Sequence, residues 1–202
     1  AIQEEGEGIY ATVLHDRTND DLKAIRETLR PGDVVSLQGT VQRGGYQPTI
    51  FVTDLKVLDH RPMPAPIPAV FGRLFRGADT GKRVVFEGIV QAVDDQRPLV
   101  SLLVDVDARE VLVKGRQEDF PTPFDTLVDA VVRITGVSGT VRNTRGEFLR
   151  PAFWVTQPED IAIVTLAPTS VFEAPLRKLE SLADYRSGNR LAHRVRTRGV
   201  VT

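Results

Sequence analysis

Hydrophobic and polar positions alternate along much of the chain, and one alternating pattern occurs four times. In each copy two apolar or β-branched residues stand two positions apart, and a glycine follows two positions later. The copies are Val35–Val41, Val84–Val90, Val132–Ser138 and Val195–Val201. A period of two predicts strands with one buried face. Glycine weakens a regular strand, so its recurrence predicts a bend or bulge where each strand curls around a small barrel.

Turn-forming residues follow the first and third copies. Residues 43–48 contain two glycines and a proline, residues 142–147 contain an asparagine and a glycine, and a hydrophobic run follows each segment, at 50–53 and 153–156. Both segments predict β-hairpins.

The middle part of the chain contains a complete series of elements. Strands are predicted at 84–93, 99–106, 110–114, 130–141 and 148–155, with a short helix or turn at 124–128. The order of three strands, a helix and two strands is that of the OB barrel. The sequence therefore predicts an all-β fold with short helices, built from tandem OB-fold-like five-stranded Greek-key barrels.

The repeats also predict a domain organisation. We expect an OB-like barrel lacking its first strand at 1–60, with a strand at 8–14 and a helix at 20–29. A proline-rich linker with a short helix follows at 61–81, and a complete barrel at 82–166. A second linker with a short helix occupies 167–190, and 191–202 would begin a further barrel. We expect this last strand to pair with an incomplete barrel, in the same chain or by exchange between chains.

Composition narrows the range of partners. The 202 residues are 41% hydrophobic and carry a formal net charge of -1, so they have no excess of positive charge for binding nucleic acid. The chain has no cysteine, which excludes disulfides and thiolate metal sites. No apolar run is long enough to cross a bilayer, so no membrane insertion is expected within this sequence. The start at Ala1, with Met63 as the single methionine, suggests a segment of a longer protein.

Several segments together resemble a known family. They are residues 5–10, 30–35, 44–48, 127–133, 139–143 and 193–202. In these segments the chain resembles the tandem OB-like periplasmic sensor region of bacterial membrane-bound two-component histidine kinases. The resemblance implies a non-catalytic sensory or protein-interaction module that provides signal input to such a kinase. It also implies a periplasmic or extracellular location and a kinase domain outside this sequence.

Motifs for catalysis are missing from the sequence. His15, His60 and His193 do not have the spacing of metal ligands. Acidic pairs such as Asp105 and Asp107 lack the remaining positions of a calcium loop, which favours solvated turns. No nucleophile elbow, phosphate loop or dinucleotide fingerprint occurs. We therefore predict no catalytic residue, no metal site, no cofactor and no enzymatic activity in this segment.

The predicted fold leaves binding functions open, because OB barrels bind oligosaccharides or single-stranded nucleic acid. The candidate ligand-binding residues are Tyr46, Arg142, Asn143, Arg145 and Trp154. An OB-type binding module for carbohydrate or single-stranded nucleic acid is thus the alternative to a sensory module. Its partner would be an unidentified small ligand or a protein, and the net charge disfavours nucleic acid.

Overall fold

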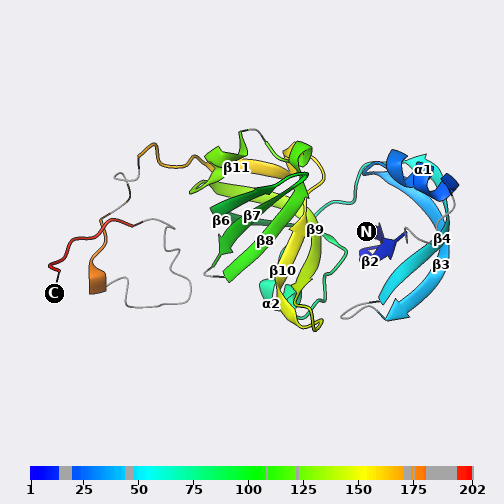
Figure 1. The fold of residues 1–202 in the computed structure, drawn as a ribbon, viewed down its shortest axis with the longest axis horizontal. Coiled ribbons are helices and arrows are strands. Elements are labelled where there is room, and N and C mark those ends of the chain that lie inside the picture. The colour runs from blue at the N-terminus through cyan, green and yellow to red at the C-terminus, as the bar shows by residue number, and fades with distance from the viewer. Residues whose placement is uncertain are drawn as a thin grey trace. The chain divides into compact units, whose positions relative to one another are not determined.

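The computed structural model describes most of the chain. The described residues are 1–13, 20–43, 48–107, 109–121, 123–170, 174, 176–180 and 195–201. Tertiary contacts divide the chain into two compact units, residues 1–84 with 137–151 and residues 85–136 with 152–202. Strands dominate, and they form a four-stranded and a seven-stranded sheet (Figure 1).

The four-stranded sheet has the order β1-β2-β4-β3. Its strands are β1 (Ile2–Glu4), β2 (Glu7–Thr12), β3 (Asp33–Arg43) and β4 (Pro48–His60). β2 runs parallel to β4, whereas β1 pairs antiparallel with β2 and β3 pairs antiparallel with β4. The strand predicted at 8–14 is β2, and the antiparallel β3–β4 pair confirms the first predicted hairpin.

The helix predicted at 20–29 is α1 (Asp20–Thr28). Its buried Leu22 packs with Val52 and Leu55 from β4, and Ile25 and Leu29 are partly buried against the same cluster. The helical spacing of the apolar residues thus places one face of α1 on the sheet.

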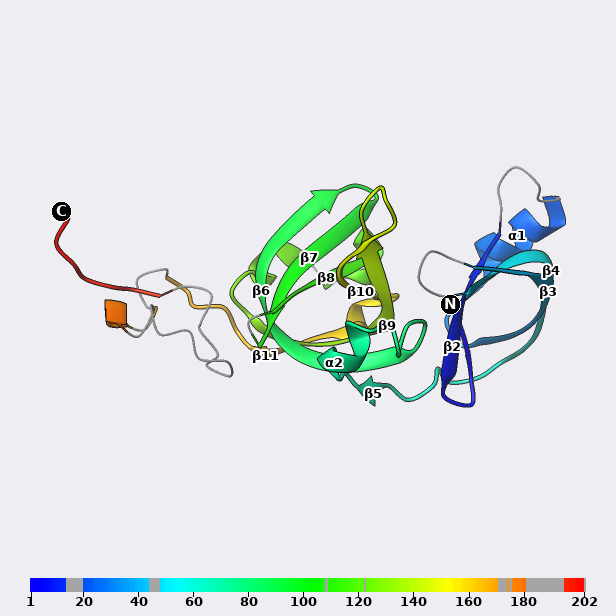
Figure 2. The same cartoon turned by 90° about the horizontal axis from the view of Figure 1, so that it is seen from below.

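The seven-stranded sheet has the order β11-β9-β10-β8-β7-β6-β5, and β9 also pairs with β6. The main strands are β6 (Arg83–Gln96), β7 (Leu99–Val106), β8 (Arg109–Arg116), β9 (Val131–Arg142) and β10 (Phe148–Trp154). The β9–β6 pairing closes these five strands into a barrel (Figure 2). β8 runs parallel to β10, as β2 does to β4 in the first sheet. This five-stranded Greek-key barrel is the predicted OB fold.

Shorter elements complete the two units. They are β5 (Ile67–Pro68), α2 (Phe71–Leu74), η1 (Gln117–Asp119), η2 (Phe124–Leu127), η3 (Pro158–Asp160) and β11 (Ile161–Thr165). The short helix expected within 61–81 is α2, and the short helix or turn expected at 124–128 is η2. Sequence analysis missed β11, which pairs antiparallel with β9. Among the described residues, no helix has both the length and the apolar character needed to cross a membrane.

The mid-strand glycines lie where neighbouring strands approach closely. The β3–β4 register shifts between Gln38 and Gly39, which is the bulge that the repeat predicts. At Gly88 a Cβ atom would lie 2.6 Å from the carbonyl oxygen of Asp105 in β7. These positions exclude larger residues because the adjacent backbone occupies the space of a side chain.

The fourth copy of the pattern behaves differently. Residues 195–201 belong to neither sheet, and Arg196 forms a single parallel bridge with Leu176. Residues 191–194 and 202, which complete the expected strand, lie outside the described residues. Beside that bridge, the N–H of Arg177 donates a 2.8 Å hydrogen bond to the carbonyl of Arg196.

Candidate ligand-binding site

The outer face of β7, β8 and β10 presents its side chains in rows. Ser101 on β7 lies opposite Lys114 on β8, and Lys114 is paired with Trp154 on β10. In the next row Leu103 lies opposite Leu112. These five residues, called the Trp154 face below, are all partly or largely exposed, because alternate side chains of a strand point to opposite faces.

Trp154 is the single tryptophan of the chain, and its side chain is exposed. Its neighbour Phe153 is fully buried, so the alternation along β10 directs the indole outward. Lys114 Nζ lies 5.9 Å from the centroid of the tryptophan ring, within range of a cation–π contact. The N–H of Val155 donates a 2.9 Å hydrogen bond to the carbonyl of Lys114, which fixes the end of β10 against β8.

The charges around the Trp154 face are mixed. Asp94 lies opposite Ser101 at one end of the row, and Asp105 lies opposite Glu110 farther along the hairpin. Arg116 is at the end of β8, and its Nη1 lies 3.5 Å from Oε1 of Glu118, with both side chains mostly exposed. Carboxylates thus accompany the cations around this face, so it does not form a continuous basic groove.

The turn at 142–147 holds three of the residues predicted from sequence, and Asn143 organises it. Asn143 Oδ1 accepts hydrogen bonds from the N–H groups of Arg145 (2.9 Å) and Glu147 (3.0 Å). Asn143 Nδ2 donates to Oε2 of Glu147 at 2.6 Å. Arg142 donates a 3.4 Å hydrogen bond from Nε to Oγ1 of Thr140. Asn143 therefore closes the turn with its own side chain, and Arg145 is exposed beside it.

The predicted candidates do not form one cluster. Arg142, Asn143 and Arg145 precede β10, whereas Trp154 is its last residue. Tyr46 lies outside the described residues. Sequence analysis did not single out Lys114 as a neighbour of Trp154. The alternation of β8 shows that Lys114 points outward, but only the parallel β8–β10 pairing places it beside the tryptophan.

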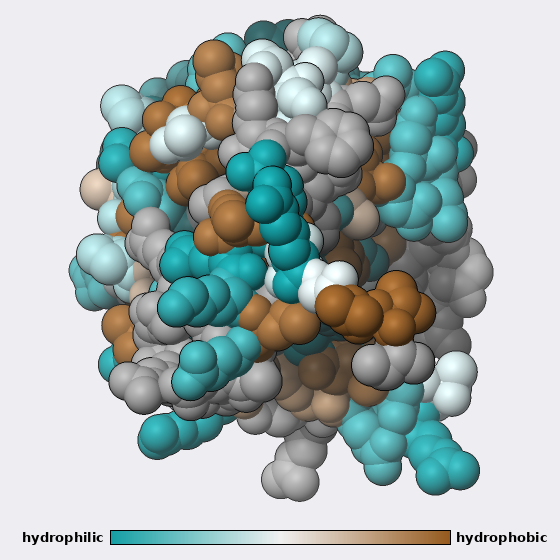
Figure 3. All heavy atoms as spheres, turned by 90° about the vertical axis from the view of Figure 1, so that its left-hand side faces the viewer, coloured by the Kyte–Doolittle hydropathy of each residue, from teal (hydrophilic) through white to brown (hydrophobic). Residues whose placement is uncertain are grey.

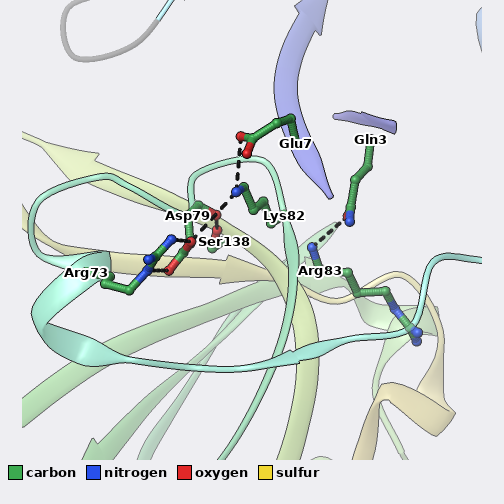
Figure 4. A network of polar contacts seen from close by, with 7 residues as sticks. All are labelled: Gln3, Glu7, Arg73, Asp79, Lys82, Arg83 and Ser138. Atoms are coloured by element: carbon green, nitrogen blue, oxygen red, sulfur yellow. Dashed lines mark hydrogen bonds and ion pairs between the residues drawn. The ribbon is translucent and has the colours of Figure 1, made fainter. Parts of the chain in front are cut away.

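A second concentration of polar side chains lies in the first unit (Figure 4). The buried Asp79 carboxylate accepts hydrogen bonds from Arg73 Nε at 2.9 Å and from Nη2 at 2.7 Å. Lys82, also buried, places Nζ 3.1 Å from Oε2 of Glu7 and 3.9 Å from Oδ1 of Asp79. Ser138 Oγ donates to the carbonyl of Asp79. The hydrogen bonds of Arg73 hold the pKa of the Asp79 carboxyl below its usual value.

Further contacts fasten the β1–β2 hairpin to the same segment. The hydroxyl of Tyr10 donates a 2.9 Å hydrogen bond to the carbonyl of Ser138, and burial raises the pKa of Tyr10 to about 12. Gln3 Oε1 accepts a 3.0 Å hydrogen bond from the N–H of Arg83. The charges of this cluster are paired with one another, which is the arrangement of a structural contact rather than of a reactive group.

The described residues contain no group of three or more histidine, aspartate or glutamate side chains placed to hold a metal ion. His60 Nδ1 lies 2.9 Å from Oδ1 of Asp33, which links the last residue of β4 to the first residue of β3. The lowered pKa of the Asp33 carboxyl follows first from the backbone N–H of Arg30 and then from this imidazole.

Comparison with known proteins returned no matching protein family and no matching curated protein. Among solved structures, the aspartyl-tRNA synthetase from Entamoeba histolytica has a TM-score of 0.41 and 19% identity, over 71% of this chain and 30% of that one. OBody AM3L09 bound to hen egg-white lysozyme has a TM-score of 0.38 and 21% identity, over 51% and 100%. This chain thus spans less than a third of the synthetase. Likenesses this weak add nothing to the strand order, which by itself defines the fold.

Proposed function

We propose that this chain is an OB-type binding module whose Trp154 face binds carbohydrate. The observation that supports this most directly is the exposed indole of Trp154, in one row with the ammonium of Lys114 and the hydroxyl of Ser101. β7 and β8 are the second and third strands of the barrel, which form the face that OB folds commonly use for ligands. An indole stacks against the apolar side of a sugar ring, while the adjacent polar groups hydrogen-bond its hydroxyls.

The mixed charge of this face favours carbohydrate over single-stranded nucleic acid. Proteins that bind single strands combine a positively charged groove with several aromatic side chains that stack on successive bases. Here one indole and the cations Lys114 and Arg116 stand near the carboxylates of Asp94, Asp105 and Glu110. Those carboxylates would repel phosphates, whereas they accept hydrogen bonds from sugar hydroxyls.

Titration of the full chain with neutral and acidic oligosaccharides tests this proposal. Because Trp154 is the single tryptophan, its fluorescence reports directly on the face. We expect saturable changes in intensity or wavelength, and weaker binding when Lys114 is replaced by alanine. Calorimetry should show binding weakened about tenfold or more by Trp154→Ala, because burial of a large apolar side chain contributes about 1.5–3 kcal/mol.

Leu149→Ala is the matched control, because Leu149 is another exposed apolar residue of β10. It should leave the affinity unchanged. If the chain binds oligonucleotides with strong salt dependence and binds no oligosaccharide, the proposed ligand is wrong and nucleic acid is the ligand of this module. Oligosaccharide binding that survives Trp154→Ala would place the ligand elsewhere.

The role in signal input to a histidine kinase, the extracytoplasmic location and the lack of catalysis rest on sequence analysis and stay predictions. A carbohydrate that bound the Trp154 face would be a suitable input for such a sensor. Measuring its effect on autophosphorylation of a kinase that contains this segment would test the sensory role separately from binding.

A further inference from the structure

The ammonium group of Lys114 differs from other cations of the barrel in what it contacts. Arg133 on β9, for example, places Nη2 2.8 Å from Oε1 of Glu87 on β6. Within the part of the chain that the structure describes, Lys114 Nζ forms no ion pair with a carboxylate, and it contacts the indole of Trp154 instead. A cation–π contact orients an ammonium group without neutralising its charge. The Trp154 face therefore carries a positive charge that is available to a ligand.

The neighbours of Lys114 are suited to a sugar ring. Ser101 lies on one side of it and Trp154 on the other, so a hydroxyl, an ammonium and an indole follow one another across three adjacent strands. Adjacent strands are about 4.8 Å apart. In an acidic sugar such as a uronate, the carboxylate is attached directly to the ring. A ring that stacks on the indole would thus place its carboxylate within reach of the neighbouring ammonium.

The acidic side chains around this face lie farther from Lys114 than its two neighbours do. Asp94 is opposite Ser101, which puts it two strands, or about 10 Å, from Lys114. Glu110 precedes Lys114 by four residues of β8, which is about 13 Å along the strand. Exposed charges at separations of about 10 Å or more are largely screened by salt. A single carboxylate at Lys114 thus avoids repulsion, whereas a nucleic-acid strand would extend its phosphates to the acidic side chains.

Exposed apolar side chains alone would not single out this face. Hydrophobic side chains are exposed among hydrophilic ones on the face of the molecule drawn in Figure 3, as is usual for protein surfaces. The Trp154 face is distinguished by a combination, because Leu103 and Leu112 form the row next to an exposed aromatic ring and a cation. Apolar surface beside one localised charge matches a ring that has a nonpolar side and a single anionic group.

We propose that the Trp154 face selects an acidic sugar, with the ring stacked on Trp154 and a ring-bound carboxylate paired with Lys114. This inference rests on the proposed carbohydrate function and adds the class of sugar. Lys114 is then the residue that determines specificity, because it adds affinity only for sugars that carry a carboxylate. Trp154 and Ser101 serve neutral and acidic sugars alike.

Calorimetry with matched oligosaccharides measures this selection. The full chain is titrated with pairs of trisaccharides of glucose, galactose or mannose, in which the terminal sugar is either neutral or oxidised at C6 to the uronate. We expect the uronate of at least one pair to bind about five- to tenfold more tightly than its neutral partner, since Lys114 is partly buried and its ion pair exceeds a fully exposed one. The ratio of the two affinities should fall as sodium chloride is added.

Variants of Lys114 assign the preference to its charge. Lys114→Met keeps the apolar stem of the side chain but removes the charge, so it should bring the ratio of affinities close to one. Lys114→Arg keeps a cation that pairs with carboxylates and should keep most of the preference. Lys56→Met is the matched control, because Lys56 is exposed on β4 in the other unit and the same charge is removed. It should leave the ratio unchanged.

The outcomes separate this inference from the function on which it rests. If the neutral and acidic members of a pair bind equally well, Lys114 does not select the sugar and the inference is wrong, while carbohydrate binding stands. If the preference persists in Lys114→Met, the carboxylate is recognised elsewhere, which also overturns the inference. If neither these trisaccharides nor any other oligosaccharide binds, the proposed function fails and the inference fails with it.

Discussion

Replacing Gly88 with alanine is expected to destabilise the barrel. A Cβ atom at this position would lie 2.6 Å from both the carbonyl oxygen of Asp105 and Cγ1 of Val104. A Cβ contact shorter than 3.0 Å is essentially never seen, so a neighbour must move by about 0.4 Å or more. One of these neighbours is backbone of the adjacent strand, and Val104 is fully buried, so neither can move freely.

The size of the effect follows from two opposing terms. Overpacking of a dense core typically destabilises by about 1–3 kcal/mol. Alanine restricts the unfolded chain more than glycine, which offsets about 0.4–1 kcal/mol. We therefore expect a net loss of about 1–2 kcal/mol in the free energy of unfolding. For a chain of this length that corresponds to a decrease in Tm of about 2–8 °C.

Urea unfolding followed by Trp154 fluorescence measures this loss, because the tryptophan is on the same barrel. Gly72→Ala provides the matched control. Gly72 lies in α2, and a Cβ atom there would meet nothing within 4 Å. The control should be as stable as the original protein or slightly more stable. If Gly88→Ala unfolds at the same urea concentration as Gly72→Ala, close backbone approach does not explain the recurring glycine.

Three further predictions concern other parts of the fold. Asn143→Ala should lower the free energy of unfolding by about 1 kcal/mol in urea titrations, because two backbone N–H groups lose their acceptor. Asn143→Asp should keep most of the original stability, because its carboxylate still accepts both hydrogen bonds. Leu22→Ala should remove about 2–4 kcal/mol and accelerate hydrogen exchange in β4, since it empties the small core under α1. The hydrogen bonds of Arg73 lower the pKa of the Asp79 carboxyl from its usual value of 3.8, so this ion pair stabilises the fold at pH values above 3.8. The stabilisation is lost as the pH falls below 3.8 and the carboxylate becomes protonated. Thermal unfolding at several acidic pH values should therefore show a weaker pH dependence in Asp79→Asn.

Much of the fold could be predicted because its signals are local. Alternation along β6 and β7, the turn residues near 143 and the helical spacing at Leu22 each depend on neighbours in the sequence. The order of these elements then selected the OB barrel. β11 escaped prediction because it is a short run whose side chains are mostly exposed, and pairing with β9 makes it a strand.

The candidate site could be predicted only in part. Trp154 was identified as an aromatic side chain near polar residues, and the structure places it beside Lys114, forty residues away in the sequence. Arg142 and Asn143, which are near Trp154 in the sequence, belong instead to the turn that precedes β10. Proximity along the chain therefore suggested a different group of residues from the one that the strand pairing assembles.

The buried polar cluster shows the same limit. Residues 77–82 have the composition of a turn, and their sequence gives no sign that Asp79 and Lys82 are buried. Burial of both charges is possible because Arg73 comes from α2, Glu7 from β2 and Ser138 from β9. No local pattern predicts such a meeting.

The sequence by itself determined the strands, their buried faces, the positions of the turns and the kind of barrel, because these depend on periodicity and on the backbone preferences of single residues. Only the tertiary structure decided which side chains share the Trp154 face and which charges are paired. Those features depend on pairing between strands distant in sequence. A parallel contact such as β8 with β10 leaves no trace in either strand alone.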